Sequence, residues 1–233
     1  MLQIRNTWFK KIKSNPNWER QLKVLFLLAV DRNNIVDLKQ VMDESNNTKD
    51  ILLLDLPDSY KMHTLKIIAA QEYFLDQCFK NSIIESNIPI FIKVTDDSIV
   101  FERKLINILQ EISRISDRFV CGLFFPSGNI QYAGGPFYCM SPKAVKEIYE
   151  YARCVTDTPF DDDLYLTGVL RTLLNISSIS VPGHTHFDML PGDIKNSPKQ
   201  ISEFCFLHNY RFEAGEQFKI WTQVDNYLVS INQ

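Results

Sequence analysis

The sequence has no uninterrupted apolar run near the length of about 18 residues that a membrane span requires. Its first residues, Met1 to Arg5, also lack the apolar stretch of a secretory signal peptide. Neither sign of charge predominates, because 25 basic and 28 acidic residues are well mixed and leave a net charge of −3. We therefore expect a soluble chain without a membrane span, and no nucleic acid as a partner.

Cysteine is sparse, and its spacing excludes some site types. None of the five cysteines forms a C-x-x-C pair, which argues against a zinc site or a thioredoxin-like motif. One or two disulfides remain open, and the odd count leaves at least one thiol outside them. Cysteine usage alone does not separate the cytosol from the secretory pathway. The cysteines are Cys78, Cys121, Cys139, Cys154 and Cys205.

The composition predicts one globular domain over residues 1–233, with 45% hydrophobic and 12% aromatic residues to build a core. Short apolar runs alternate with segments of helical periodicity, which indicates βαβ units and a mainly parallel sheet flanked by helices. The fold class expected is thus a Rossmann-like α/β domain. Strands are predicted over 23–30, 51–54, 90–94 and 119–125, and helices over 35–42, 65–81, 105–115, 142–152, 158–173 and 218–228.

Two adjacent carboxylates, Asp96 and Asp97, follow the apolar run Pro89 to Val94. An unpaired carboxylate beside a core is costly, and a divalent cation would cancel that cost. Oxygen ligands favour Mg²⁺ or Mn²⁺, whose coordination shells the phosphates of a substrate can complete. In an open α/β sheet this position lies at the ligand-binding edge. The alternative is an exposed acidic turn at the end of a strand.

Three further features carry both a structural and a functional interpretation. Gly134 and Gly135 could bring backbone close to a ligand or could lie in a plain loop. The three acids Asp161 to Asp163 suit the start of a helix through its dipole, yet they are more than capping requires. The pair His184 and His186 is interpreted as part of an irregular loop, because no other ligands cluster with it in sequence.

Six segments, taken in order, resemble the β-1,3-galactosyltransferase-like family of inverting glycosyltransferases (glycosyltransferase family 31). The resemblance spans nearly the whole chain, and it implies a GT-A fold, a UDP-sugar as donor, a glycan as acceptor and Mn²⁺, or Mg²⁺ in its place, at the diphosphate. The segments are Arg5-Asn6-Thr7-Trp8, the block from Asp55 to Lys66, Thr95-Asp96-Asp97, the stretch from Gly134 to Ser141, the stretch from Asp162 to Gly168, and Leu207-His208.

The resemblance also implies roles for single residues. Asp97 would ligate the metal, with Asp96 beside it facing the sugar-nucleotide. His208 matches a histidine near the metal and diphosphate, and Asp163 matches the general base. Gly134 and Gly135 would let backbone pass close to the donor sugar. The positions assigned to the nucleotide pocket, each of which could equally form a structural ion pair, are Arg5, Asp58 and Lys66.

The implied function is transfer of galactose or N-acetylhexosamine from a UDP-sugar to a glycan hydroxyl in β-1,3 linkage, in protein or lipid glycosylation in the Golgi.

Two departures from the family pattern motivate an alternative, a catalytically inactive relative that binds a glycan or a partner enzyme. Thr95 stands where the family has an acid, and Met1 stands four residues before Arg5, where the family has an anchor, a stem and a first strand. Self-association remains open. A Mg²⁺-dependent phosphohydrolase would explain the carboxylates but not the other segments.

Overall fold

The computed structural model describes residues 1–30, 33, 35–80, 89–154, 161–181, 185–187, 206–208 and 215–230. The expected helix start at 158–160, His184 and Cys205 lie outside these residues. In chain order the described elements are α1 (Leu2–Arg5), α2 (Trp8–Ser14), α3 (Pro16–Gln21), β1 (Phe26–Ala29), α4 (Ile35–Thr48), β2 (Ile51–Leu54), η1 (Tyr60–Met62), α5 (His63–Lys80), β3 (Phe91–Val94), β4 (Ser98–Val100), α6 (Glu102–Ile115), β5 (Phe119–Ser127), β6 (Ile130–Met140), α7 (Pro142–Ala152), η2 (Asp163–Leu170), α8 (Arg171–Leu173), β7 (Ser177–Ser180), β8 (Thr185–Phe187), β9 (Phe206–His208) and α11 (Glu216–Ser230).

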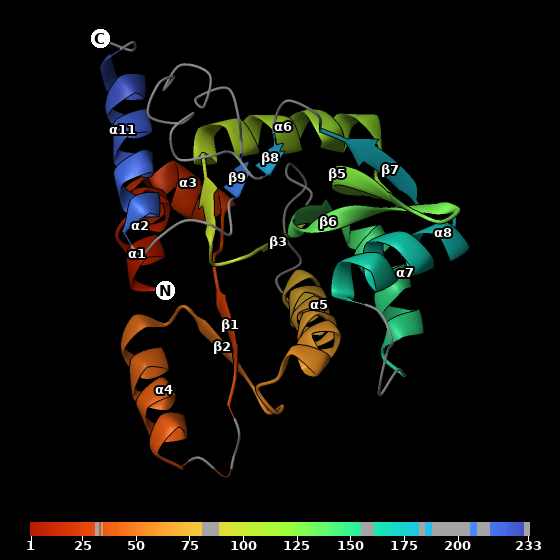
Figure 1. Ribbon diagram of the computed structural model, residues 1–233, viewed down its shortest axis with the longest axis horizontal. Helices are drawn as coiled ribbons and strands as arrows, with labels where there is room; N and C mark the ends of the chain where they lie inside the picture. Colours follow the sequence, from red (N-terminus) through yellow and green to blue (C-terminus); the bar gives the residue numbers. More distant parts are fainter. Residues whose placement is uncertain are drawn as a thin grey trace.

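The α/β class is confirmed, because strands and helices alternate through most of the described chain (Figure 1). The strands form three sheets, with the orders β1-β2, β3-β6-β5-β7 and β4-β9-β8. Pairing is more mixed than expected. Three pairs are parallel, β1/β2, β5/β7 and β8/β9, but β3/β6, β5/β6 and β4/β9 are antiparallel. A mainly parallel sheet is therefore wrong for the described strands.

The main reason for the difference is β6, which occupies the stretch that sequence reasoning treated as a loop around Gly134 and Gly135. A two-residue turn at Gly128 and Asn129 joins β5 to β6, and Gly128 has a φ of 58°, a value that glycine adopts without steric cost. Such a turn returns the chain directly alongside β5, so the two strands must be antiparallel. The interpretation of His186 as part of an irregular loop is also wrong, because residue 186 lies in β8.

Alternate residues of β5 and β6 face two separate cores. Phe119 and Phe137 belong to a cluster with α1, α2 and α6, whereas Val120 and Tyr138 belong to a cluster with α5, α7 and η2. The side chains of a strand point alternately to its two faces, so this sheet is covered on both sides. In Figure 1, α6 lies across one side of the sheet and α5 and α7 lie on the other.

The first core contains a disulfide between Cys121 and Cys139, which are partners in the register of β5 and β6. Both cysteines are buried. Of the other described cysteines, Cys78 and Cys154 are free. The structure thus identifies one of the bridges that the cysteine count left open.

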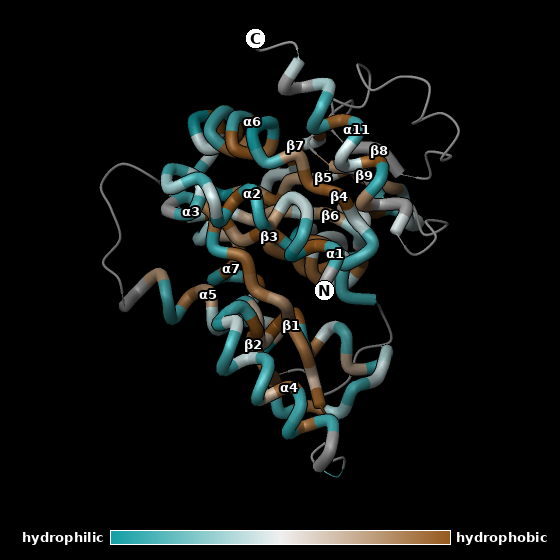
Figure 2. Tube along the Cα trace, turned by 90° about the vertical axis from the view of Figure 1, so that its left-hand side faces the viewer, coloured by the Kyte–Doolittle hydropathy of each residue, from teal (hydrophilic) through white to brown (hydrophobic). Residues whose placement is uncertain are grey.

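The remaining elements follow from local sequence. Ser141 caps α7 by accepting a hydrogen bond from the amide of Ala144, and Pro142 occupies the first helical position, as predicted. Figure 2 shows β1 as a largely apolar trace and α4, on the outside, as mainly polar with scattered apolar positions. Among the described residues, every helix falls short of the length and apolarity that crossing a bilayer demands.

Candidate functional site

Asp97 and His208 meet at one end of the candidate site. They come together because β4 pairs with β9 in antiparallel register, with Ser98 opposite His208 although 110 positions separate these two residues. His208 Nδ1 lies 3.1 Å from Asp97 Oδ1 and 3.4 Å from Ser98 Oγ. The imidazole is buried, with 7% of the residue exposed. Two residues assigned to the metal are therefore adjacent in space.

The surroundings of Asp97 favour its ionised form. Burial acts to raise the pKa of Asp97, but its close neighbours His208 and Thr95 outweigh this effect, so the pKa is lowered. Oδ1 is shielded from solvent and has no aligned hydrogen bond in the structure. A buried carboxylate oxygen without an aligned hydrogen-bond donor, next to an imidazole nitrogen, is a suitable ligand for a divalent cation such as Mn²⁺.

The cation would need further ligands, because the described residues contain no cluster of three or more histidine, cysteine, aspartate or glutamate side chains able to hold a metal. Asp96 is exposed next to Asp97. Thr95 contributes no carboxylate; its hydroxyl lies 2.8 Å from Ser98 Oγ. Substrate phosphates commonly supply the missing ligands of such ions.

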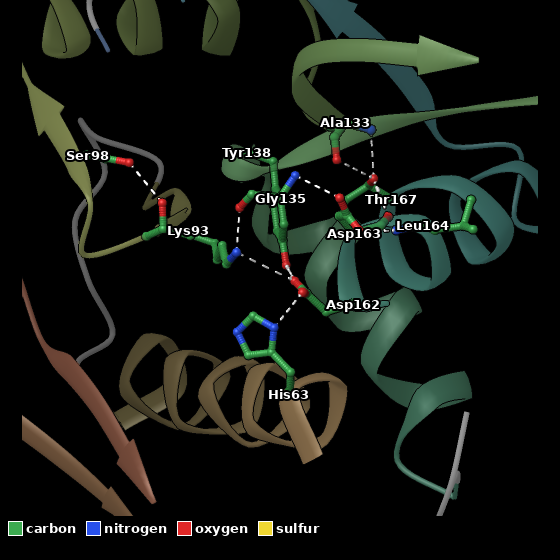
Figure 3. Close-up of polar contacts among 11 residues, drawn as sticks. His63, Lys93, Ser98, Ala133, Gly135, Tyr138, Asp162, Asp163, Leu164 and Thr167 are labelled. Atoms are coloured by element: carbon green, nitrogen blue, oxygen red, sulfur yellow. Dashed lines mark hydrogen bonds and ion pairs between the residues drawn. The ribbon is translucent and has the colours of Figure 1, made fainter. Parts of the chain in front are cut away.

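The second part of the site is the acidic pair Asp162 and Asp163 at the start of η2, a π-helical segment (Figure 3). Asp162 is 3% exposed, and its neighbours are side chains that carry donor groups. The hydroxyl of Tyr138 donates to it at 2.9 Å, and His63 Nδ1 and Lys93 Nζ lie 3.1 and 4.0 Å from its carboxylate oxygens. Burial acts to raise the pKa of Asp162, but these partners lower it overall.

The pKa of Asp163 is shifted in the opposite direction, upward. Its oxygens accept hydrogen bonds of 2.8 Å from two backbone amides, those of Gly135 and Leu164. Burial nevertheless raises the pKa of Asp163, and the negative charge of Asp162 adds to this effect. Adjacent carboxyl groups whose pKa values are pushed apart are typical of sites that hold and move protons.

Gly135 explains why η2 can approach β6 so closely. A Cβ atom on this residue would lie 3.1 Å from Asp163 Oδ2, tighter than nine in ten real Cβ contacts. The structure thus places the Asp163 carboxylate against Gly135, where sequence reasoning expected a ligand. Gly134, the other glycine assigned to the donor, is buried within β6. Whether either glycine also borders a bound sugar stays a prediction.

Consecutive residues of β6 connect the two parts of the site. The carbonyl of Gly135 accepts a hydrogen bond from Lys93 Nζ, and the carbonyl of Pro136 accepts one of 3.1 Å from the amide of Thr95. Asp163 is bound to the amide of the same Gly135. Two consecutive residues of β6 therefore contact both the acidic pair and the segment that leads to Asp97.

The residues assigned to a nucleotide pocket have protein partners. The Arg5 guanidinium donates to Asp50 at 2.7 and 2.9 Å and also pairs with Glu44, which ties α1 to the start of β2. Lys66 Nζ lies 2.5 Å from Asp58 Oδ1. These contacts match the structural ion pairs that were the alternative for all three residues. Their contribution to nucleotide binding stays a prediction.

Sequence reasoning missed three residues that surround Asp162: His63, Lys93 and Tyr138. One signal was available, because Lys93 is the one charged residue in the apolar run Pro89 to Val94. Strand alternation puts a residue at that position on an inward face, and a buried lysine needs a partner. Lys93 is 7% exposed, and its Nζ lies over the Tyr138 ring.

A depression of about 510 Å³ lies elsewhere, at the β5–β6 turn and α8. Its charged residue, Arg171, already donates to the carbonyls of Thr167, Ile176 and Gln131. None of the site residues described above lines this depression. The chemistry therefore points to the carboxylates and not to this depression.

Comparison with known proteins shows that the chain matches the model of a known family. The family model described as Galactosyltransferase matches residues 2–131, more than half of the chain. UDP-GalNAc:beta-1,3-N-acetylgalactosaminyltransferase 1 of Rattus norvegicus is 27% identical over 210 residues, covering 80% of this chain and 59% of that protein. The chain thus spans less than two thirds of this relative. A solved glycosyltransferase involved in glycosylation of the major capsid of PBCV-1 covers 84% of this chain and 96% of its own, with a TM-score of 0.39 and 12% identity, a likeness too low to carry an argument.

Proposed function

The chain belongs to the galactosyltransferase family, and on that premise we propose that it is an inverting, UDP-sugar-dependent hexosyltransferase that forms a β-1,3 linkage to a glycan hydroxyl. The sugar transferred would be galactose or an N-acetylhexosamine. The name of the rat relative, which specifies UDP-GalNAc and a β-1,3 linkage, supports both the donor and the linkage. The observation that carries the proposal is the pair Asp162 and Asp163, with pKa values displaced in opposite directions, held by β6 together with the Asp97 segment.

The proposed chemistry assigns the proton transfer to Asp163. The oxygen of the acceptor hydroxyl attacks the anomeric carbon of the donor sugar, and the bond from that carbon to the UDP oxygen breaks on the opposite face. The hydroxyl proton passes to Asp163, whose raised pKa makes it a stronger base than an ordinary aspartate. Asp162, kept ionised by His63, Lys93 and Tyr138, supports Asp163 without taking the proton itself.

Asp97 and His208 would hold Mn²⁺, or Mg²⁺ in its place, with Asp96 near the sugar-nucleotide. When bound, this ion supplies positive charge next to the departing diphosphate. The contribution of the chain is to keep Asp97 ionised and to aim the buried Oδ1 toward His208. Arg5, Asp58 and Lys66 remain proposed supports of the nucleotide, through their ion pairs.

A second function, glycan or partner binding without turnover, is favoured by Thr95, which stands in place of an acid and whose hydroxyl lies 2.8 Å from Ser98 Oγ. Calorimetric titration of UDP with and without Mn²⁺, on the unaltered chain and on Asp97→Ala, separates the two proposals. UDP binding that depends on Mn²⁺ and is lost in Asp97→Ala supports the transferase. Absence of UDP binding in the unaltered chain would leave only the inactive relative.

The base is tested by turnover of Asp163→Asn, which keeps the shape of the side chain and one acceptor oxygen. We expect turnover to fall about 100-fold or more while UDP binding persists. Asp117→Asn is the matched control, because Asp117 is an exposed carboxylate paired with Lys143 on the surface. Full turnover in Asp163→Asn would remove this residue from the proton transfer.

We place the chain in the Golgi lumen, and the disulfide between Cys121 and Cys139 supports an oxidising compartment. Maleimide labelling of the unreduced, denatured chain from cells tests this. Cys121 and Cys139 should resist labelling, whereas the free, exposed Cys154 should react. Labelling of all three would place the chain in a reducing compartment.

A further inference from the structure

Tyr60 is an exposed aromatic residue that is nevertheless held in place next to the acidic pair. With 76% of its surface in solvent, it is the most exposed large apolar or aromatic residue among those described. Its hydroxyl donates a hydrogen bond to the carboxylate of Asp161, and its ring centroid lies 6.1 Å from that of His63, with the ring planes tilted by 31°. The ring therefore has neighbours on two sides, His63 and Asp161, although little packs over it.

The position of Tyr60 relates it to the proposed base. His63, its ring neighbour, contacts Asp162, and Asp161 stands two residues before Asp163. The hydrogen bond to Asp161, and then the negative charges of all three aspartates, raise the pKa of Tyr60, which places the phenol within electrostatic reach of the whole acidic run.

We propose that Tyr60 is the stacking platform for the acceptor sugar, with its ring against the apolar C–H face of the sugar whose hydroxyl meets Asp163. This inference rests on the proposed function and adds the residue that selects the acceptor. A hexose presents apolar C–H groups on one face and hydroxyls around its rim, so an aromatic ring beside carboxylates matches both parts. Because a tyrosine side chain has only two rotatable bonds to order, binding costs little side-chain entropy.

Electrostatics assigns this surface to the acceptor and not to the donor. The negative charges of Asp161, Asp162 and Asp163 oppose the approach of a diphosphate, but carboxylates accept hydrogen bonds from neutral sugar hydroxyls. The segment suited to a cation lies beyond Gly135 and Pro136, at Asp97 and His208. The diphosphate of the donor would thus lie at Asp97 and His208, and the acceptor sugar at the acidic pair.

Steady-state kinetics of Tyr60→Ala, Tyr60→Phe and Tyr60→Trp test the assignment. Tyr60→Ala should raise the KM for the acceptor about fivefold or more, with UDP affinity unchanged. Tyr60→Trp and Tyr60→Phe, which keep an aromatic face, should retain most of the affinity. Tyr151→Ala is the matched control, because Tyr151 is 59% exposed on α7. A loss of UDP affinity in Tyr60→Ala would overturn the proposal in favour of nucleotide stacking.

A second measurement does not depend on turnover, so it separates failure of this inference from failure of the proposed function. Saturation-transfer NMR uses methyl β-galactoside and methyl N-acetyl-β-glucosaminide as probes on the unaltered chain and on Tyr60→Ala. Transfer to the C–H protons of either probe, lost in Tyr60→Ala and kept in Tyr151→Ala, supports the platform even if the chain is inactive. The proposed platform is overturned if neither probe receives transfer, or if transfer is equal in the unaltered chain and in Tyr60→Ala. This holds whatever the UDP titration shows.

Discussion

The amide nitrogen of Gly135 donates a hydrogen bond of 2.8 Å to Oδ2 of Asp163, and the space where a side chain of residue 135 would begin is taken up by the same carboxylate. This contact joins β6 to the first residue of η2. It fixes the direction of the proposed base through backbone atoms, which have less freedom than a side chain.

Gly135→Ala should therefore disturb turnover more than binding. The added Cβ would lie 3.1 Å from Asp163 Oδ2, so the carboxylate must move by a few tenths of an ångström. We expect kcat to fall about 10- to 100-fold, because small displacements of a reacting group are costly. UDP titration and thermal unfolding serve as controls. Unchanged kcat would show that the position of Asp163 is not critical.

The rate of transfer should depend on the ionisation of Asp163. Only the carboxylate form can accept a proton, so kcat/KM should fall as the pH drops through the raised pKa of Asp163. Asp162→Asn removes the neighbouring negative charge, which makes ionisation of Asp163 easier. The acid limb of the pH profile should then move to lower pH, while Asp117→Asn leaves it in place. A shift to higher pH would contradict the coupling of the two carboxyl groups.

Thr95→Asp should strengthen cation binding. Thr95 bonds to Ser98, and it donates to Asp97 as one of the contacts that lower the pKa of that residue. A carboxylate at position 95 would add negative charge beside Asp97, and affinity for a divalent cation rises with the charge of its ligands. We expect Mn²⁺ to bind about tenfold more tightly in the presence of UDP, measured by electron paramagnetic resonance. Thr95→Asn, of equal size but neutral, should show no gain; equal affinities for the two variants would exclude a cation near position 95.

Arg5→Met should lower stability. Asp50 is 3% exposed, and Arg5 supplies its main ionic partner, so the substitution leaves a buried charge uncompensated. We expect a loss of about 2 to 3 kcal/mol in the free energy of unfolding. This is less than for a fully buried ion pair, because the Arg5 side chain stays partly in water. Lys143→Met, which breaks a fully exposed pair with Asp117, should cost clearly less than Arg5→Met, because solvent screens that pair. Denaturant unfolding at pH 7 provides the comparison.

The same pair predicts how stability changes with pH. Burial acts to raise the pKa of Asp50, but hydrogen bonds from Arg5 and Thr48 lower it overall, below the ordinary value of 3.8. A lowered folded-state pKa contributes stability above the unfolded pKa, and that contribution is lost as the pH falls through the folded pKa. The difference in unfolding free energy between the unaltered chain and Arg5→Met should therefore shrink below about pH 4. If the difference stays constant down to pH 2, the pair does not stabilise the fold electrostatically.

Several elements could be predicted from local pattern alone. The apolar run at 51–54 corresponds to β2 within the same limits, and the helical periodicity of 105–115 lies within α6. The start of α7 followed from Ser141 and Pro142. These elements were predictable because their signals depend on near neighbours in the chain.

Other features were not predictable in this way. The glycines at 134 and 135 suggested a loop, but tertiary pairing with β3 and β5 makes β6 a central strand of its sheet. Strand pairing depends on partners far away in sequence, and it overrides a weak local preference. Sequence reasoning also had no means to see that Arg5 would pair with Asp50 or that His63 would reach Asp162, since each contact joins separate elements.

By itself, the sequence determined the α/β class, the resemblance to a glycosyltransferase family and the residue types at the site, because these depend on periodicity and on ordered motifs. Only the tertiary structure decided that His208 faces Asp97, that Gly135 receives Asp163, and that Tyr60 stays exposed beside the acidic run. The physical reason is that pKa values, burial and close approach are properties of neighbours in space, and the neighbours of each of these residues come from distant parts of the chain.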